Sequence, residues 1–573
     1  MVMHKFSKFI LILVSFCVGY FGIATFFNSQ PHNTPDKNID VVVGGIVPHH
    51  LVADEIIQKL FTIVGNQNPK TIILVSPDHW GVAKSNFTTT AKSNFGGVLV
   101  DTSFRGKLIN ELPSNIEFDD ELLNHEHGVT GLVPYIKKLS PQTKIVPIAV
   151  SAITSKITLD KISHFLSKTD SNVVIIASSD FSHYLPSLAA DLHDSTSIAV
   201  ISAFDRSNFR NLEVDCWQCL YIVSSVSELK NAKKSELVGH SNSAKLSTSE
   251  NTAPETTSYV GLVFRESGQN STDSTATLLS VGDIMLGRYV ETLMNSAGEN
   301  YPFEKISQFL RGIDIVSGNL EGTIITDHKQ TPDFSTKFSF SPRVAKTLRL
   351  NNFSLVSLAN NHALDYGENG LKETSGFLKQ FEIDTSGHPS KIEGTKVATK
   401  DVRGQKIAFA SFNFTGPYPK EQEAYELVKN FKEKNNFVVV NIHWSEEYAL
   451  KANDFQKIVA HNLIDSGADL IIGHHPHVVQ EIEQYKNKII FYSLGNFIFD
   501  QYFSKYTKEG LTIGTTLNDQ EVIYRLFPIN IVQSQPSLMT GARAQEWLGD
   551  LSTRSDSALI EEIKSGMIVV PRN

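Results

Sequence analysis

Three of the four residues from His474 to His477 are histidines, a dense group of candidate metal ligands. They follow the apolar run 468–472, which predicts a buried strand that ends at Gly473. Side chains alternate in extended chain, so we expect His475 and His477 to point the same way and His474 to turn aside. Two converging neutral imidazoles can bind one divalent metal, whereas a polar loop bonded to water and backbone is the alternative.

Candidate ligands also follow five other apolar runs between 278 and 492. Oxygen donors mixed with imidazoles suit Mn, Fe or Zn better than Mg or Ca. Two such ions, about 3.5–4 Å apart, can activate water against a phosphoester. Six strand ends of this kind disfavour the alternative of separate polar groups at loop starts. The side chains at the five further ends are Asp283, Asn319, Glu321, Asn360, Asn361, His362, Asp365, His443, Glu446, Glu447, Ser493 and Asn496.

Histidines and aspartates also end three apolar runs in the first half of the chain, in the segments 48–50, 76–80 and 178–183. Each histidine alone would be structural or solvated. Repeated at three strand ends, they predict the mouth of a second site.

The chain has three cysteines, Cys17, Cys216 and Cys219. The CxxC spacing of the last two is typical of a redox or metal pair. The surrounding segment 214–226 is apolar and helix-like, however, so we expect two buried free cysteines instead. Structural disulfides are not expected to hold this protein together.

The elements that position these residues follow an α/β pattern. Runs that are apolar on both faces alternate with segments of helical periodicity, and 573 residues are too many for one core. The net charge of −9, without a long basic run, argues against nucleic acid as the main partner. We expect an N-terminal anchor over 1–30, a globular region over 39–266, a polar linker over 267–276, a second globular region over 277–555 and a tail over 556–573.

The N-terminal segment from Phe9 to Phe27 is almost wholly apolar and close to the about 20 residues that cross a bilayer as a helix. Lys5 and Lys8 precede it, and the next basic residue apart from histidine is Lys37. This predicts a single-pass transmembrane helix in the cell membrane, with both globular regions outside the cytoplasm. A cleaved signal peptide is the alternative, although no clear small-x-small cleavage site follows the run.

The first globular region resembles the Memo family, known in prokaryotes as AmmeMemoRadiSam system protein B. The matching motifs lie at 46–49, 76–79, 126–134 and 178–183. The resemblance implies a fold similar to class III extradiol dioxygenases, with Fe or Cu bound by His49 and His79. It also implies that Asp180 and His183 act as acid/base or substrate-contacting groups.

One departure from that family concerns the third metal ligand. Animal members supply a cysteine late in the domain, but the segment 239–259 contains none. His240 is the strong metal donor in that segment. The site could hold iron or copper through two histidines, or have lost its metal and serve as a binding module.

The second globular region resembles the CapA (PGA_cap) family over about 276–555, through the motifs at 282–286, 319–321, 360–362, 443–444, 473–478 and 493–497. The resemblance implies a sandwich similar to calcineurin-like metallophosphatases, with His362 as general acid or transition-state stabiliser. This region departs from true phosphoesterases in one respect, because no Asp-x-His motif precedes or replaces Gly282-Asp283. One metal position would therefore lack a ligand or take it from elsewhere. The implied metal ligands are Asp283, Glu321, Asn361, His443, His475 and His477.

The leading hypothesis is a membrane-anchored metal-dependent hydrolase, directed at phosphoesters. It would act in the synthesis or export of a cell-envelope or capsule polymer such as poly-γ-glutamate, on that polymer or another anionic substrate. A non-catalytic polymer-binding or scaffold protein is one alternative. An iron-dependent oxidoreductase in the first region is another. No motif identifies the polymer.

Overall fold

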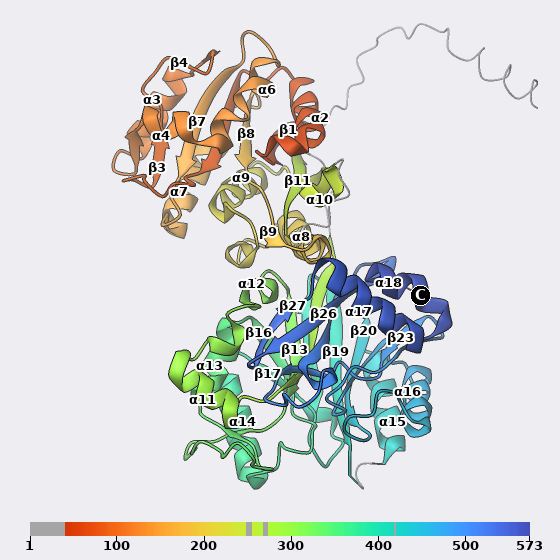
Figure 1. Cartoon of the computed structure of the whole chain (residues 1–573). Helices are drawn as coiled ribbons and strands as arrows, with labels where there is room; N and C mark the ends of the chain where they lie inside the picture. Colours follow the sequence, from red (N-terminus) through yellow and green to blue (C-terminus); the bar gives the residue numbers. More distant parts are fainter. Residues whose placement is uncertain (1–40, 248–254, 267–272, 417–419, 573) are drawn as a thin grey trace, which may run out of the picture. The chain divides into compact units, whose positions relative to one another are not determined.

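The computed structural model describes residues 41–247, 255–266, 273–416 and 420–572. One sheet of nine strands lies between Val42 and Arg265, and sheets of nine and six strands lie between Ala276 and Pro571 (Figure 1). Helices alternate with these strands along the chain. The predicted mixed α/β class is therefore confirmed.

The first sheet has a parallel centre. Strands β1, β8, β2 and β7 lie side by side in that order, and they pair with one another in parallel. Their carboxyl ends therefore meet at one edge, where the segments 48–50, 76–80 and 178–183 begin. The strands of this sheet are β1 (Val42–Val47), β2 (Thr71–Pro77), β3 (Phe87–Thr89), β6 (Ile116–Phe118), β7 (Lys144–Val150), β8 (Val173–Ser178), β9 (His183–Leu185), β10 (Lys234–Asn242) and β11 (Thr256–Arg265).

Helices cover both faces of the centre of this sheet, which explains why its central strands β1, β2, β7 and β8 are apolar on both faces. Ile72 and Leu74 pack with α2 on one face, whereas Ile73 and Val75 pack with α7 and α9 on the other. The apolar faces of these helices follow from side chains spaced three and four residues apart. The helices of this region are α2 (Asp54–Gly65), α3 (Thr102–Glu111), α4 (Asp120–His125), α5 (His127–Thr130), α6 (Val133–Lys137), α7 (Lys156–Ser167), α8 (Ser187–Ser202), α9 (Trp217–Leu229) and α10 (Ser243–Leu246).

Two sheets pack face to face in the second region. Leu278, Ile315 and Leu355 of the nine-stranded sheet share one core with Phe409 and Ile472 of the six-stranded sheet. The nine-stranded sheet contains β12 (Ala276–Ile284), β13 (Ile315–Leu320), β16 (Phe353–Ser357), β17 (Asp384–Ser386), β24 (Asn496–Ile498), β25 (Glu509–Leu517), β26 (Glu521–Val532), β27 (Gln535–Leu538) and β28 (Met567–Pro571). The six-stranded sheet contains β18 (Ala398–Val402), β19 (Gln405–Phe414), β20 (Phe437–Trp444), β21 (Leu470–His474), β22 (Ile482–Tyr485) and β23 (Lys488–Phe491).

Helices cover the outer faces of this sandwich. Helices α11 (Arg288–Ala297), α13 (Arg343–Leu350) and α14 (Gly367–Gln380) pack on the nine-stranded sheet, and α15 (Glu421–Lys432) and α16 (Asp454–Asp465) pack on the six-stranded one. Near the C-terminus, α17 (Gly541–Arg554) and α18 (Ile560–Ser565) join the core between the sheets, and β28 pairs with β26. Ligands can therefore come from both sheets, since β12, β13 and β16 are parallel and so are β19, β20 and β21.

Two predictions need correction. Among the residues described, no helix is long and apolar enough to cross a membrane. This finding contradicts the predicted anchor, and the location outside the cytoplasm that rested on it is withdrawn. The segment Phe9–Phe27 itself lies outside the described residues.

The second correction concerns the cysteines. Cys216 and Cys219 are buried, as expected, but they are joined in a disulfide at the start of α9 rather than free. The sequence spacing permitted this bond, and the first turn of α9, which runs from the N-cap residue Cys216 to Cys219, brings the two sulfur atoms together.

Candidate metal sites

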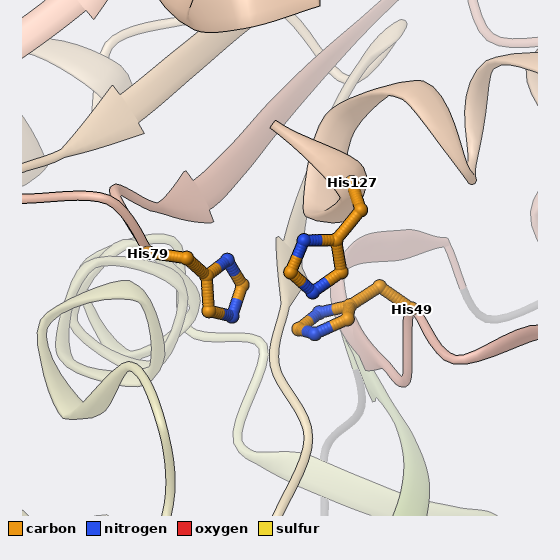
Figure 2. A group of neighbouring side chains, drawn as sticks. All are labelled: His49, His79 and His127. Atoms are coloured by element: carbon orange, nitrogen blue, oxygen red, sulfur yellow. The ribbon is translucent and has the colours of Figure 1, made fainter. Parts of the chain in front are cut away.

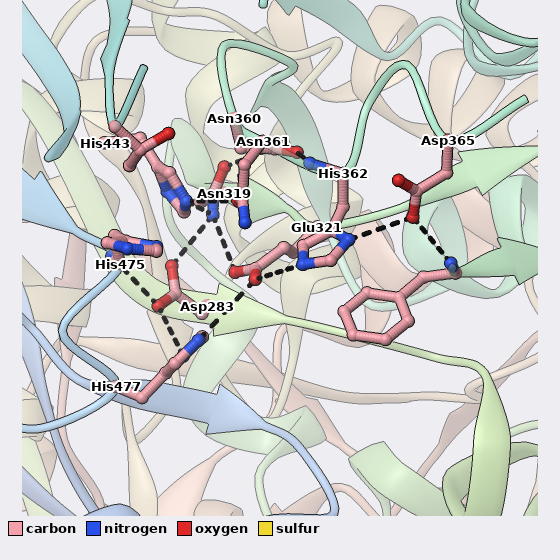
Figure 3. Close-up of polar contacts among 12 residues, drawn as sticks. Asp283, Asn319, Glu321, Asn360, Asn361, His362, Asp365, His443, His475 and His477 are labelled. Atoms are coloured by element: carbon pink, nitrogen blue, oxygen red, sulfur yellow. Dashed lines mark hydrogen bonds and ion pairs between the residues drawn. The ribbon is translucent and has the colours of Figure 1, made fainter. Parts of the chain in front are cut away.

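The predicted ligands of the second region come together at the carboxyl ends of strands from both sheets (Figure 3). Asp283 lies near the end of β12, Glu321 follows β13 and His443 belongs to β20. One ligand atom from each of these three lies within 4.8 Å of the others, and all three side chains are buried.

The histidine-rich segment contacts the same carboxylates. Nδ1 of His474 lies 3.2 Å from Oδ1 of Asp283, and Nδ1 of His477 lies 3.2 Å from Oδ2. Nε2 of His477 lies 3.7 Å from Oε1 of Glu321. The backbone N–H of His475 donates to Asp283 Oδ2 at 3.3 Å. Asp283 is thus the centre on which three histidines converge.

The backbone of this segment is not extended. His475 has φ +93° and His477 has φ +57°, both in the left-handed region that non-glycine residues seldom adopt. Such conformations persist where the surrounding structure enforces them, often at functional sites. The expectation that strict alternation turns His474 aside was therefore wrong, because His474 is the last residue of β21 and faces Asp283.

Gly473 permits the close packing beneath this segment. A Cβ atom at this position would lie 1.9 Å from the carbonyl oxygen of Tyr492. Any other residue would push β21 away from the chain that follows β23, so a glycine is required at this position.

The Asn-His pair after β16 adds two side chains to the cluster. Oδ1 of Asn361 lies 2.8 Å from Nε2 of His443. Nε2 of His362 lies 3.9 Å from Oε1 of Glu321, and its Nδ1 lies 2.9 Å from Oδ2 of Asp365. His362 is therefore held with one ring nitrogen on Asp365 and the other toward the cluster.

Two further contacts fix the position of His362. The ring of Phe338 stacks on it with centroids 3.9 Å apart, and the backbone N–H of Phe338 donates to Asp365 Oδ2 at 2.7 Å. The sequence placed Asp365 close to the site but gave no reason to pair it with His362, which only the turn after β16 brings about.

Two asparagines missing from the predicted ligand set also hold the cluster. The side-chain amide of Asn319 donates to Asp283 Oδ1 at 2.8 Å, and Oδ1 of Asn496 lies 3.0 Å from Nδ1 of His477. Both asparagines lie in the sequence motifs noted above. The amide of Asn319 orients Asp283, and the amide of Asn496 orients His477.

Burial and charge set opposite protonation tendencies in this site. Burial alone would raise the pKa of Asp283, but hydrogen bonds from His474 and His477 hold that pKa well below its usual value. Burial raises the pKa of Glu321 to about 7. Burial would lower the pKa of His477, but the charge of Glu321 and the contact with Asp283 raise it to about 9. Carboxylates and imidazoles this close stabilise one another's charged forms.

The donor set fits a bound cation. Oε1 of Glu321 and Nδ1 of His475 are buried and have no hydrogen-bond partner within the described structure. Leaving such atoms unpaired costs about 1–3 kcal/mol each. Metal coordination would satisfy both, and the mixed oxygen and nitrogen donors suit Mn, Fe or Zn.

A second group of histidines lies at the edge of the first sheet (Figure 2). The ring of His49, after β1, lies with its centroid 5.0 Å from that of His79, after β2, and 4.9 Å from that of His127. The rings of His79 and His127 stack at 4.1 Å. One nitrogen from each ring lies within 4.8 Å of the others, a spacing that could hold a metal ion. His127 was not among the ligands predicted from the motifs.

Both predicted ligands of this site are oriented by a partner on Nδ1. Nδ1 of His79 lies 2.6 Å from Oε1 of Glu126, and Nδ1 of His49 lies 3.1 Å from the hydroxyl of Ser178. This arrangement leaves Nε2 of each ring as the nitrogen directed into the site. Partners of this kind accompany metal-binding histidines in many proteins.

An unpredicted carboxylate meets both Nε2 atoms. Oδ2 of Asp215 lies 3.4 Å from Nε2 of His49 and 3.5 Å from Nε2 of His79. Burial lowers the pKa of His79, but its contacts with Asp215 and Glu126 outweigh burial and raise that pKa to about 10. Asp215 lies outside every motif noted in the sequence, which gave no signal for its position.

The two predicted catalytic residues of this region have different surroundings. Oδ2 of Asp180 lies 2.5 Å from Nδ1 of His50 and 3.5 Å from Nε2 of His49, so Asp180 belongs to the site. The ring of His183 lies against that of Tyr184, with centroids 5.9 Å apart. Within the described residues, no hydrogen bond, ion pair or ring contact joins His183 to Asp180, His49 or His79.

His240 lies elsewhere. Its Nε2 lies 2.8 Å from Oδ2 of Asp194 and 3.9 Å from Oδ1 of Asp191, which also pairs with Lys245. These contacts place His240 in a separate group with Asp191 and Asp194, in which one ligand atom from each residue lies within 4.8 Å of the others. His240 therefore does not complete the set of His49 and His79.

Comparison with known proteins covers both regions. Residues 277–501 match the family described as bacterial capsule synthesis protein PGA_cap, and residues 23–262 match Memo-like protein. Both resemblances predicted from the motifs are therefore confirmed.

Three relatives illustrate these matches. Capsule biosynthesis protein CapA of Bacillus anthracis is 35% identical over 288 residues, covering 46% of this chain and 70% of that protein. PGA biosynthesis protein CapA of Bacillus subtilis is 35% identical over 275 residues, covering 45% and 72%. A MEMO1 family protein of Archaeoglobus fulgidus is 29% identical over 208 residues, covering 34% and 76%.

Proposed function

Because the chain belongs to the PGA_cap family of bacterial capsule synthesis proteins, with a Memo-like region before it, we propose that its second region is a metal-dependent phosphoesterase. This enzyme would act in the synthesis of a capsule or poly-γ-glutamate-like polymer, as the names of the two CapA relatives suggest. The face-to-face sandwich supports a fold of the metallophosphatase type. The substrate would be an anionic phosphoester linked to that polymer.

One observation carries this proposal, namely the convergence of buried acids and imidazoles from both sheets on Asp283. Buried charged groups are stable only when they are paired or bind a metal. Oε1 of Glu321 and Nδ1 of His475 lack a hydrogen-bond partner within the described structure, which supports metal binding over a hydrogen-bond network that is complete without it.

The residues that would hold metal are Asp283, Glu321, Asn361, His443, His475 and His477. A bound divalent ion would activate water and stabilise negative charge on the phosphoryl oxygens. His362 would donate a proton to the leaving oxygen through Nε2, since Asp365 occupies its Nδ1. Asp365 is thereby a positioning residue, and Phe338 excludes water from one face of the ring.

The test uses the full chain, an aryl phosphodiester and an aryl phosphomonoester, each with added Mn²⁺. His475→Ala should lower kcat/KM at least about 100-fold, since it removes a metal ligand rather than an outer partner. His461→Ala is the matched control, because His461 pairs with Glu483 on the same sheet and should keep full activity.

Two results would contradict the proposal. Wild-type protein that elemental analysis finds free of bound Mn, Fe and Zn after loading would remove the metal site. Metal-loaded protein that binds the polymer but hydrolyses neither ester would favour the non-catalytic binding protein.

A specific observation favours a second activity in the Memo-like region. Glu126 and Ser178 fix the rings of His49 and His79 so that their Nε2 atoms face the same carboxylate. We infer that these histidines bind iron or copper and that this region, whose fold we propose to be of the extradiol dioxygenase type, is an oxidoreductase. A metal-free region would overturn this inference.

A further inference from the structure

Asp215 is a largely buried carboxylate of the Memo-like region, and neither the sequence motifs nor the family matches assign it a role. Its Oδ2 lies 3.4 Å from Nε2 of His49 and 3.5 Å from Nε2 of His79. One oxygen atom thus faces the free nitrogen of both histidines. Its side chain is 11% exposed, compared with 47% for His127.

The position of Asp215 is fixed by the chain on both sides. The hydroxyl of Ser179 donates to its Oδ1 at 2.6 Å, and the backbone N–H of Asp180 donates to its Oδ2 at 3.1 Å. Its own backbone N–H donates to the carbonyl of Asp180 at 3.2 Å. The next residue, Cys216, caps α9 and is bonded to Cys219. The carboxylate of Asp215 is therefore already positioned to act as a metal ligand.

Other side chains near the two histidines are less suited to complete a ligand set. The ring of His127 stacks on that of His79 with 27° between their planes. The nitrogen lone pairs of an imidazole lie in the plane of its ring, so the lone pairs of two stacked rings do not point at one shared position. Oδ2 of Asp180 lies 2.5 Å from Nδ1 of His50 and 3.5 Å from Nε2 of His49, and within the described structure no ion pair joins Asp180 to His79. Of the two carboxylates, Asp215 is the one that contacts the Nε2 atoms of both histidines.

We propose that Asp215 is the third protein ligand of the metal in the Memo-like region, completing a two-histidine, one-carboxylate set with His49 and His79. This ligand set with open positions is typical of non-haem Fe(II) sites that act on oxygen. The segment 239–259 has no cysteine to serve instead. The inference rests on the metal site proposed for this region and adds the identity of its third ligand.

The test measures metal binding in the full chain, with His475→Ala present throughout to weaken metal binding in the second region. Anaerobic titration with Co²⁺, followed by calorimetry and by its visible absorption, reports the Memo-like site. Asp215→Asn should weaken Co²⁺ binding at least about 100-fold, beyond the 10–100-fold typical of outer partners, and change the absorption. Asp215→Glu, which keeps the carboxylate, should retain most of the affinity.

His127→Ala is the matched control and should leave Co²⁺ affinity within about threefold, as expected of a residue outside the ligand set. His79→Ala defines the background. A parent protein that binds no more Co²⁺ than His79→Ala would remove the proposed metal site altogether. A parent that binds, with Asp215→Asn binding equally and His127→Ala failing, would keep the metal site and overturn the role of Asp215.

A measurement that needs no substitution at Asp215 guards against misfolding. X-ray absorption of the Fe(II)-loaded protein, in the His475→Ala background, should report two imidazoles and a carboxylate oxygen. A first shell of three imidazoles would overturn the inference.

Discussion

The two candidate sites of this chain use the same residue types at strand ends, yet they differ in depth. In the first region His79 and His127 are 23% and 47% exposed, because one sheet supplies the strand ends and the other side of the site stays open. In the second region Asp283 and Glu321 are fully buried between ligands from two facing sheets. The number of sheets at a site thus decides how much water reaches it.

That difference has chemical consequences. Buried polar atoms usually have hydrogen-bond partners, so the lack of one for Oε1 of Glu321 and Nδ1 of His475 within the described structure is what supports our proposal of a cation in the second site. In the first site the Nδ1 atoms of His49 and His79 already have partners, Ser178 and Glu126. The open side of this site is accessible to water or substrate. An open site with few ligands suits a reaction in which a second molecule joins the metal.

The largest effect is expected in the second region, at His362, the proposed proton donor. Asp365→Asn should lower kcat for a phosphoester about 100-fold, because it disturbs the contact that orients His362, while bound metal stays unchanged. Steady-state kinetics and elemental analysis on the same sample check this. Loss of metal together with activity would make Asp365 part of the metal-binding structure instead.

An intermediate effect is expected in the open site. Glu126→Gln should weaken metal binding about 10-fold, since it removes the carboxylate behind Nδ1 of His79, and should leave phosphoesterase activity intact. Titration with Co²⁺ measures the metal binding, and ester hydrolysis measures the phosphoesterase activity. Glu121→Gln, at an exposed position on the preceding helix, is the control. An equal effect from both variants would contradict an orienting role.

The smallest effect tests whether stability and site can be separated. Asn453→Ala removes the capping box with Gln456 at the start of α16 and should cost about 1 kcal/mol of folding stability. Urea unfolding followed by circular dichroism measures it. Neither metal site should change its affinity. A change in the second site would mean that α16 helps to hold His443 or His475.

Much of the fold and part of each site were predictable from local pattern. Apolar runs marked strands such as β2 and β21, and the histidines after them reached their sites, since the carboxyl ends of parallel strands share an edge. Asp215 was not predictable, because it follows no strand and enters the site only where the chain turns into α9. His474 was misjudged because alternation ends where the backbone becomes left-handed at His475.

The sequence by itself determined the α/β class, the two families and the residue types available at the strand ends, because strand period and local motifs are written in neighbouring residues. Only the tertiary structure decided which of these residues meet. It placed Asp365 next to His362, Asp215 between His49 and His79, and His240 on Asp194 instead of at the candidate metal site. Each of these contacts joins side chains whose approach depends on turns and on sheet packing, and neither is encoded in spacing along the chain.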